Sequence, residues 1–150
     1  MGWALDTDDS FSVSSVRHPL DSTLVPSGDS GTRWNNWVPI KLNILVWRIS
    51  LSSIPTRERL SSRGIPVPSI MSTICMVAVE TIDHIFFGCH DLRDIWGMVA
   101  IWWGISTPSQ FSVHALPHWA DDVNFRRGQR KAFDAIIITS FWCLWNFCNS

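Results

Sequence analysis

Apolar side chains recur every three or four residues after residue 37. The segment over residues 1–33 is instead rich in Ser, Asp, Thr and Gly. This spacing predicts an amphipathic helix of about 14 residues. Its expected core face consists of Ile40, Ile44, Trp47 and Leu51. Pro39 suits the first turn of this helix, because proline lacks the backbone N–H that a first turn leaves unpaired. We therefore expect a helical domain to begin near residue 34.

Further helices are predicted downstream. Pro55 and Thr56 are expected to open a short helix that Gly64 closes, and two more helices are expected over residues 80–87 and 91–103. The expected domain organisation is an extended, flexible lead-in over 1–33 with a short strand at 11–16, a helical domain over 34–104, a loop over 105–127 and an apolar C-terminal helix over 128–150.

Four residues in the helical domain have the spacing of a zinc site with one ligand changed. Ser72, Cys75, His84 and Cys89 read S-x2-C-x8-H-x4-C. Thiolates and imidazoles at such spacings are the usual ligands of tetrahedral zinc, whereas a serine hydroxyl barely ionises near pH 7. The pattern predicts a weakened or lost zinc site held by Cys75, His84 and Cys89, and a large gain in zinc affinity for Ser72→Cys.

The fourth zinc ligand is left open by the sequence. Water, His90, Asp83 or Glu80 are the alternatives, and His90 is disfavoured because neighbouring side chains often point apart. The competing interpretation is that Cys75 and Cys89 are ordinary buried thiols. In either case the expected fold class is mostly α, a small helical module around a Cys/His zinc-type loop with a short N-terminal extended segment.

Bulk composition excludes several classes of function. A chain of 150 residues suffices for one core, and a net charge of -1 gives no global attraction to nucleic acid or acidic membranes. The acidic start, Met1–Asp9, is unlike a signal peptide, and no apolar run reaches the length of about 20 residues that a membrane span needs. We expect an intracellular protein, nuclear or cytoplasmic, without a membrane partner. No nucleophile elbow, phosphate loop or H-E-x-x-H motif is present, so no catalytic residue is assigned.

Local charge differs from the bulk value. Residues 41–63 hold five basic side chains against the single acidic residue Glu58. The basic residues are Lys41, Arg48, Arg57, Arg59 and Arg63. Arginine suits phosphate contacts and tryptophan can stack on bases, although Trp47 falls on the expected core face. The prediction is weak, non-specific contact with RNA or DNA.

Three further features are expected to be structural. The basic cluster at 126–131 is interpreted as a solvated, frayed helix start. The Trp-Ala-Asp-Asp sequence at 119–122 is interpreted as a solvated turn, since no apolar strand leads into it as in a polymerase site. Cys143 and Cys148 are expected to pack in the core from the C-terminal helix.

The order of these signals resembles the reverse transcriptase zinc-binding domain of plant LINE-type (non-LTR) retrotransposons. The matching residues are Trp3-x-Leu5, Phe11-Ser12-Val13-x-Ser15, Trp37-x-Pro39-x-Lys41-x-Asn43, Trp47-Arg48, Ile54-Pro55-Thr56 and the Cys75, His84, Cys89 cluster followed by Ile95-Trp96. They cover residues 3–104. Ser72 stands where the family has its first cysteine.

The resemblance implies a non-catalytic, zinc-binding part of an RNA-directed DNA polymerase polyprotein, here a fragment with a degraded metal site. In that role the module would hold RNA or DNA near the polymerase domain. One alternative is a helical segment that docks on the polymerase or an RNase H-like domain through Trp102, Trp103, Trp142 and Trp145. The other is a relic without activity.

Overall fold

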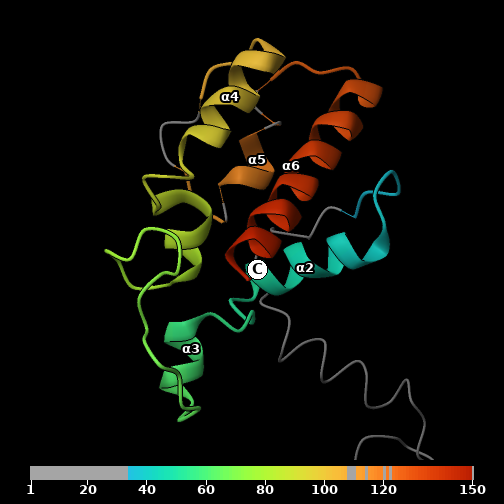
Figure 1. Ribbon diagram of the computed structural model, residues 1–150. Coiled ribbons are helices and arrows are strands. Elements are labelled where there is room, and N and C mark those ends of the chain that lie inside the picture. The colour runs from blue at the N-terminus through green and yellow to red at the C-terminus, as the bar shows by residue number, and fades with distance from the viewer. Residues whose placement is uncertain (1–33, 108–110, 114, 120, 122, 150) are drawn as a thin grey trace, which may run out of the picture. The chain divides into compact units, whose positions relative to one another are not determined.

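The described part of the chain is mostly helical, as the sequence predicts. The computed structural model describes residues 34–107, 111–113, 115–119, 121 and 123–149 (Figure 1). Its helices are α2 (Ile40–Ser50), α3 (Arg57–Ser62), the π-helix η1 (His84–Gly88), α4 (Asp94–Trp103), α5 (Leu116–Trp119) and α6 (Arg127–Cys148). One antiparallel bridge, Met71 to Val79, is the only strand-like pairing among these residues. The expected lead-in over 1–33, with its strand at 11–16, lies outside the described residues.

The long helix α6 contacts both α2 and η1 (Figure 1). An aromatic cluster joins α6 to η1 and α4: the ring of Phe141 lies 5.0 Å from that of Phe86 and 5.4 Å from that of Trp96, measured between centroids. All three side chains are buried, and the indole N–H of Trp96 donates a 2.6 Å hydrogen bond to the carbonyl of Phe86. Such aromatic contacts add to the free energy of burial. The cluster therefore fixes η1, which carries His84, against two helices.

The prediction for the core face of α2 is wrong. The buried side chains are Leu42, Asn43, Leu45 and Ile49. The expected core residues are instead exposed to between 39% and 68%, and Trp47 is 42% exposed. The helix is where the pattern placed it, but it is rotated about its axis.

A buried pair of asparagines explains the rotation of α2. Asn43 accepts a 2.9 Å hydrogen bond from the backbone N–H of Asn35 and donates a 3.0 Å bond to the Asn35 carbonyl. The Asn35 amide in turn donates to the carbonyl of Lys131 in α6, at 2.7 Å. Buried polar groups are costly unless they are paired, so this network allows one orientation of α2 against α6. A pattern of apolar residues does not predict that an asparagine is buried, so it could not indicate this orientation.

The short helix α3 has the expected ends. Thr56 is its N-cap, and the Thr56 hydroxyl accepts a hydrogen bond from the backbone N–H of Arg59 at 3.4 Å. Gly64 follows the helix with φ +75°, a left-handed conformation that glycine adopts without steric cost. The capping signals in the sequence are confirmed.

Two other predicted elements differ in extent. The helix expected over 80–87 is found over 82–88, where residues 82 and 83 are α-helical and continue into η1. Glu80 belongs instead to an extended pairing, in which its backbone N–H donates to the carbonyl of Ile70. The helix expected over 91–103 begins three residues later, at Asp94. The segment expected to be a loop over 105–127 contains the one-turn helix α5.

The start of α6 is anchored, which contradicts the expected frayed end. The backbone N–H of Arg126 donates to the Gln129 side chain at 3.1 Å, and Arg130 forms an ion pair with Asp121. Trp119 is buried, and its indole N–H donates to the carbonyl of Ser106 at 3.0 Å. The Trp-Ala-Asp-Asp segment thus contributes a core tryptophan and an ion-paired aspartate, while Ala120 and Asp122 lie outside the described residues.

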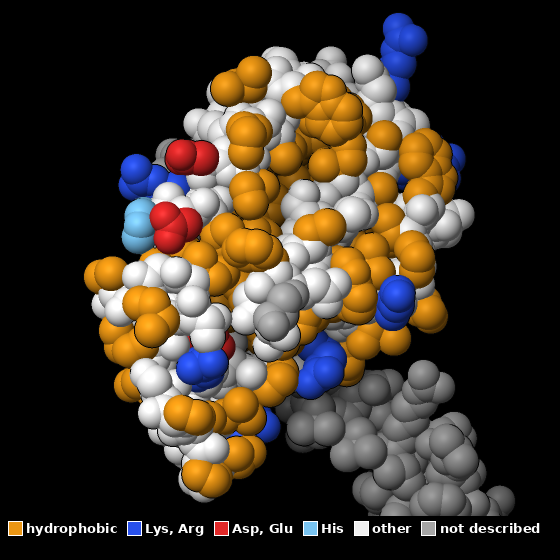
Figure 2. Space-filling model, in the orientation of Figure 1, with side chains coloured by type: hydrophobic (Ala, Val, Ile, Leu, Met, Phe, Trp, Pro, Cys, Tyr) orange, Lys and Arg blue, Asp and Glu red, His pale blue; other side chains and the backbone are white. Residues whose placement is uncertain are grey.

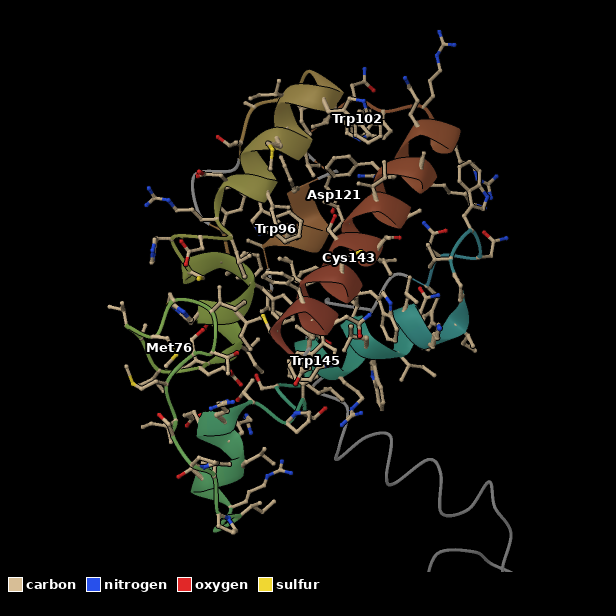
Figure 3. All side chains as sticks on the ribbon, in the orientation of Figure 1. Met76, Trp96, Trp102, Asp121, Cys143 and Trp145 are labelled. Carbon is tan, nitrogen blue, oxygen red and sulfur yellow. The ribbon has the colours of Figure 1, made fainter. Side chains whose placement is uncertain are left out.

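Surface expectations for the C-terminal half are confirmed only in part. Trp102, labelled near the top of Figure 3, is 73% exposed. Partial burial against the core is found for Trp103, Trp142 and Trp145. Cys143 is exposed, so its predicted core position is wrong, and Cys148 is half-buried. Among the described helices none has the length and hydropathy required to span a bilayer.

Candidate metal centre

The first cysteine sits at the tip of a hairpin formed by residues 70–80, named here the Cys75 hairpin. The Met71–Val79 bridge, a 2.8 Å bond from the Ser72 N–H to the Ala78 carbonyl and a 2.9 Å bond from the Glu80 N–H to the Ile70 carbonyl hold its two sides together. Met76, at the outer edge of the hairpin, has φ +56° (Figure 3). This left-handed residue turns the chain sharply directly after Cys75.

The turn directs hydrogen-bond donors at the Cys75 sulfur. The backbone of Val77 makes the largest contribution, with smaller ones from the backbone of Ala78 and the side chains of His84 and Ser72. These bonds favour the thiolate over the thiol and outweigh partial burial, and they lower the pKa of Cys75 from 9.0 to about 6. A thiolate is the form that binds a metal, so the hairpin prepares this sulfur as a ligand.

The second cysteine follows η1 in a well-anchored turn. The Cys89 backbone N–H donates to the His84 carbonyl at 2.8 Å, and its own carbonyl accepts from the N–H groups of Leu92 and Arg93. The side chain of Cys89 is buried. Burial raises the pKa of the Cys89 thiol, and the nearby charge of Cys75 raises it further. The two thiols therefore differ in acidity: the pKa of Cys75 is lowered by its hydrogen bonds and the pKa of Cys89 is raised by burial.

The described structure brings the thiols together with two histidines. The Nε2 atom of His84 lies 3.3 Å from the Cys75 sulfur. The ligand atoms of Cys75, Cys89 and His90 all lie within 4.8 Å of one another. His90 was expected to point away from Cys89; that expectation is wrong, because the chain turns immediately after η1 and directs both side chains toward Cys75.

The other suggested ligands are engaged elsewhere. Glu80 is buried, and its carboxylate accepts from the Arg57 backbone N–H at 3.1 Å and forms an ion pair with the Arg57 side chain at 3.5 Å. Asp83 is exposed and does not belong to the cluster that the described residues form. Ser72 is buried, and its oxygen accepts a 3.3 Å hydrogen bond from the Ile74 N–H. A hydrogen bond from the Ser72 side chain also helps to lower the pKa of Cys75.

The Cys75 hairpin is held from both sides. The ion pair between Arg57 and Glu80 joins its last residue to the start of α3. Thr73 donates a 3.3 Å hydrogen bond to the Cys148 carbonyl near the end of α6. These two contacts fix the Cys75 hairpin against the start of α3 and the end of α6.

The donor set fits zinc. Two sulfurs and two imidazoles are a common structural zinc set, with Zn–S near 2.3 Å and Zn–N near 2.0 Å, which gives about 3.3 to 3.8 Å between donors. The 3.3 Å separation of His84 Nε2 and Cys75 Sγ is already close to that value, and the separations among Cys75, Cys89 and His90 exceed it by about 1 Å at most. His84 does not belong to that three-residue group, so its ring would have to move toward Cys89 for all four residues to hold one ion. Ser72 in place of a cysteine does not remove the fit, because a second histidine is within reach.

The predicted nucleic-acid residues divide into two groups. Lys41 lies over the Trp142 ring at 5.0 Å, Arg48 donates to the Ser53 carbonyl at 3.2 Å, and Arg57 pairs with Glu80. Arg59 lies in α3 and Arg63 is the C-cap of this helix, and neither forms an ion pair with a described residue. On the face shown in Figure 2 the basic side chains are scattered instead of gathered in one stripe. Trp47, which the sequence placed on the core face of α2, is exposed and could stack on a base.

Comparison with known proteins supports the metal centre. A model of the family described as "zinc-binding in reverse transcriptase" matches residues 11–96, which is more than half of the chain and includes Cys75, His84, Cys89 and His90. Neither the search of curated proteins nor the search of solved structures found a match. The converging thiols and imidazoles and the family match agree, and the chain belongs to the family of zinc-binding domains in reverse transcriptases.

Proposed function

We propose that the chain is a zinc-binding, non-catalytic module of a retrotransposon reverse transcriptase polyprotein that contacts nucleic acid. The observation that carries the proposal is the cluster of Cys75, Cys89 and His90 within the matched family region, with His84 beside Cys75. Zinc held by such a closed set stabilises a fold and leaves no open position for a substrate. The role proposed for the metal is therefore structural.

The origin proposed for the parent protein is a plant LINE-type, non-LTR element. The lead-in Phe11-Ser12-Val13 and the Ile54-Pro55-Thr56 sequence support this origin by their resemblance to that group. In such a protein the module would act inside the cell, in the nucleus or the cytoplasm, beside the polymerase domain. Ser72 in place of the first cysteine marks the metal site as degraded relative to that group.

Contact with RNA or DNA is proposed for α3 and for the exposed side of α2. Arg59 in α3 and its C-cap residue Arg63 are available for such contact, since no described residue forms an ion pair with either of them. On α2, Trp47 is exposed next to the basic side chain of Arg48. Arginine binds phosphate and an exposed indole stacks on bases without sequence preference, so weak, non-specific binding is expected.

A salt titration tests this contact. For single-stranded RNA the slope of log K against log salt is about -0.7 per phosphate contact, so Arg59→Ala/Arg63→Ala should reduce the slope by about 1.4. Arg93→Ala is the matched control, because Arg93 is exposed and pairs only with its neighbour Asp94 among the described residues. Equal slopes for the double variant and the control would contradict the assignment of α3 as a nucleic-acid surface.

Docking on the polymerase domain is a second candidate function, favoured by the outer face of α4. Met98, Ile101 and Trp102 lie three and four residues apart and are 60%, 81% and 73% exposed. Hydrophobic side chains also gather over α4 and α6 on the face shown in Figure 2. Exposed apolar patches of this kind mark protein interfaces. In this case Ile101→Glu should abolish co-purification with the polymerase domain while zinc content stays unchanged; unchanged co-purification would rule out this face.

A further inference from the structure

The zinc site defined by the sequence spacing is one ligand short. Cys75, His84 and Cys89 supply three donors, and structural zinc requires four. Ser72 is buried and is hydrogen-bonded to the Ile74 N–H and to Cys75. A neutral hydroxyl in that arrangement is a poor zinc donor, because zinc would have to displace its proton.

His90 lies where the missing donor is needed. Its ligand atom is within 4.8 Å of both the Cys75 and the Cys89 sulfurs. The side chain is 62% exposed, so the ring can rotate toward the sulfurs without opening the core. Among the described residues no other His, Cys, Asp or Glu side chain joins these two thiols in a three-member group. His84 lies 3.3 Å from the Cys75 sulfur but outside this group, so a single ion held by all four residues requires the His84 ring to approach Cys89.

A carboxylate orients the His90 ring. The Nε2 atom of His90 lies 3.0 Å from an Asp91 carboxylate oxygen. Histidine ligands commonly donate their second ring N–H to a carboxylate, which fixes the ring and strengthens the ligand nitrogen. With Nε2 held by Asp91, Nδ1 is the ring nitrogen that remains for a metal.

We propose that His90 is the fourth zinc ligand of this chain and compensates for the serine at position 72. The zinc set is then Cys75, His84, Cys89 and His90, two sulfurs and two nitrogens. This inference rests on the proposed function, because it assigns a ligand within the same zinc site. It changes the status of Ser72 from a lost ligand to a hydrogen-bond donor for the Cys75 thiolate.

A double-substitution cycle on the full chain tests the assignment. Zinc affinity is measured by chelator competition for the unaltered chain, His90→Ala, Ser72→Cys and the combined variant. Loss of a direct ligand should lower zinc affinity by more than the about 10- to 100-fold typical of outer-shell partners, so His90→Ala is expected to lose at least about 100-fold. In the Ser72→Cys background the same change should cost less than about tenfold, because the thiolate introduced at position 72 supplies the fourth donor.

Two controls and a spectroscopic readout complete the experiment. Ser72→Ala should keep zinc affinity within about tenfold, since only a hydrogen bond to Cys75 is lost. Arg93→Ala, exposed in the same turn, should have no effect. With Co²⁺ as the probe, the sulfur-to-metal absorption should correspond to two thiolates in the unaltered chain and in His90→Ala, but to three in the combined variant.

The outcomes separate the inference from the proposed function. Zinc affinity that is the same with and without His90 would overturn the ligand assignment alone, as the module would still bind zinc. A cost of His90→Ala that is equal in the unaltered and the Ser72→Cys backgrounds would also overturn it. Failure of both the unaltered chain and Ser72→Cys to bind zinc would overturn the zinc module itself.

Discussion

Residue spacing predicts different things in two regions of the molecule. One region is the Cys75 hairpin together with η1, and the other is the helix α2. In the metal region the spacing of Cys75, His84 and Cys89 predicted one cluster, and the described structure places His84 beside Cys75 and groups Cys75 with Cys89 and His90. In α2 the spacing of apolar residues correctly indicated a helix but selected its exposed side, including Trp47. The ligands of one metal ion must all lie around a single point, whereas a stripe of apolar residues only suggests which face of a helix is buried.

The difference has a physical basis in polar contacts. Zinc donors are few and chemically distinct, so a pattern of Cys and His has few interpretations. Helix α2 is apolar on most of its circumference, and the buried pair Asn35–Asn43 decides which side faces α6. Among single substitutions, the loss of a buried aromatic side chain should lower the free energy of unfolding most, followed by the loss of a side chain on the buried face of α2.

The largest effect is expected from the aromatic cluster beneath the metal region. Trp96→Ala removes a fully buried indole and its bond to the Phe86 carbonyl, and should lower the free energy of unfolding by about 3–5 kcal/mol. Trp102→Ala, in the same helix but exposed, should change it by no more than about 0.5 kcal/mol. Urea unfolding monitored by circular dichroism measures both. Equal losses would contradict the arrangement of α4.

The rotation of α2 is tested by two isoleucines in one helix. Ile49 is fully buried and Ile44 is 40% exposed. Ile49→Ala should lower the free energy of unfolding by about 2–5 kcal/mol, and Ile44→Ala by less than about 1 kcal/mol. The same denaturant titration applies, and a larger loss for Ile44→Ala would restore the orientation that the apolar pattern predicted.

The particular residues show how much could be predicted from sequence. Helix ends with local signals were predictable, as at Thr56 and Gly64, because capping depends on neighbouring residues alone. The position of His90 was not, since it depends on the turn after η1 and on the fold of the Cys75 hairpin. The ion pair between Arg57 and Glu80 joins residues 23 apart and has no local signature.

The smallest change concerns proton occupancy at the thiols of the metal-free protein. The pKa of Cys75 is lowered to about 6, while burial raises the pKa of Cys148 to about 11. At pH 7 about nine tenths of Cys75 is then thiolate, against about one part in ten thousand of Cys148. Iodoacetamide should therefore modify Cys75 at least about tenfold faster than Cys148. Mass spectrometry of the peptides measures the two rates. Similar rates at pH 7 would contradict the hydrogen-bond set around Cys75.

The same pKa values determine the direction of the pH dependence. Because the Cys75 pKa is lower in the folded state than in the unfolded chain, its stabilising contribution is complete above pH 9 and is lost as pH falls through about 6. The Cys148 contribution is complete below pH 9 and is lost as pH rises through about 11. Cys75→Ser should therefore flatten the rise in stability between pH 6 and pH 9, with Cys143→Ser as the exposed control.

The most direct test of the account is the zinc-to-protein ratio of the purified chain, measured by elemental analysis together with circular dichroism before and after chelation. The account predicts close to one zinc per chain, and loss of helical signal when the metal is removed, because the Cys75 hairpin and η1 are joined at the metal. A chain that contains no zinc, and whose helical signal is unchanged by zinc or chelator, would contradict it.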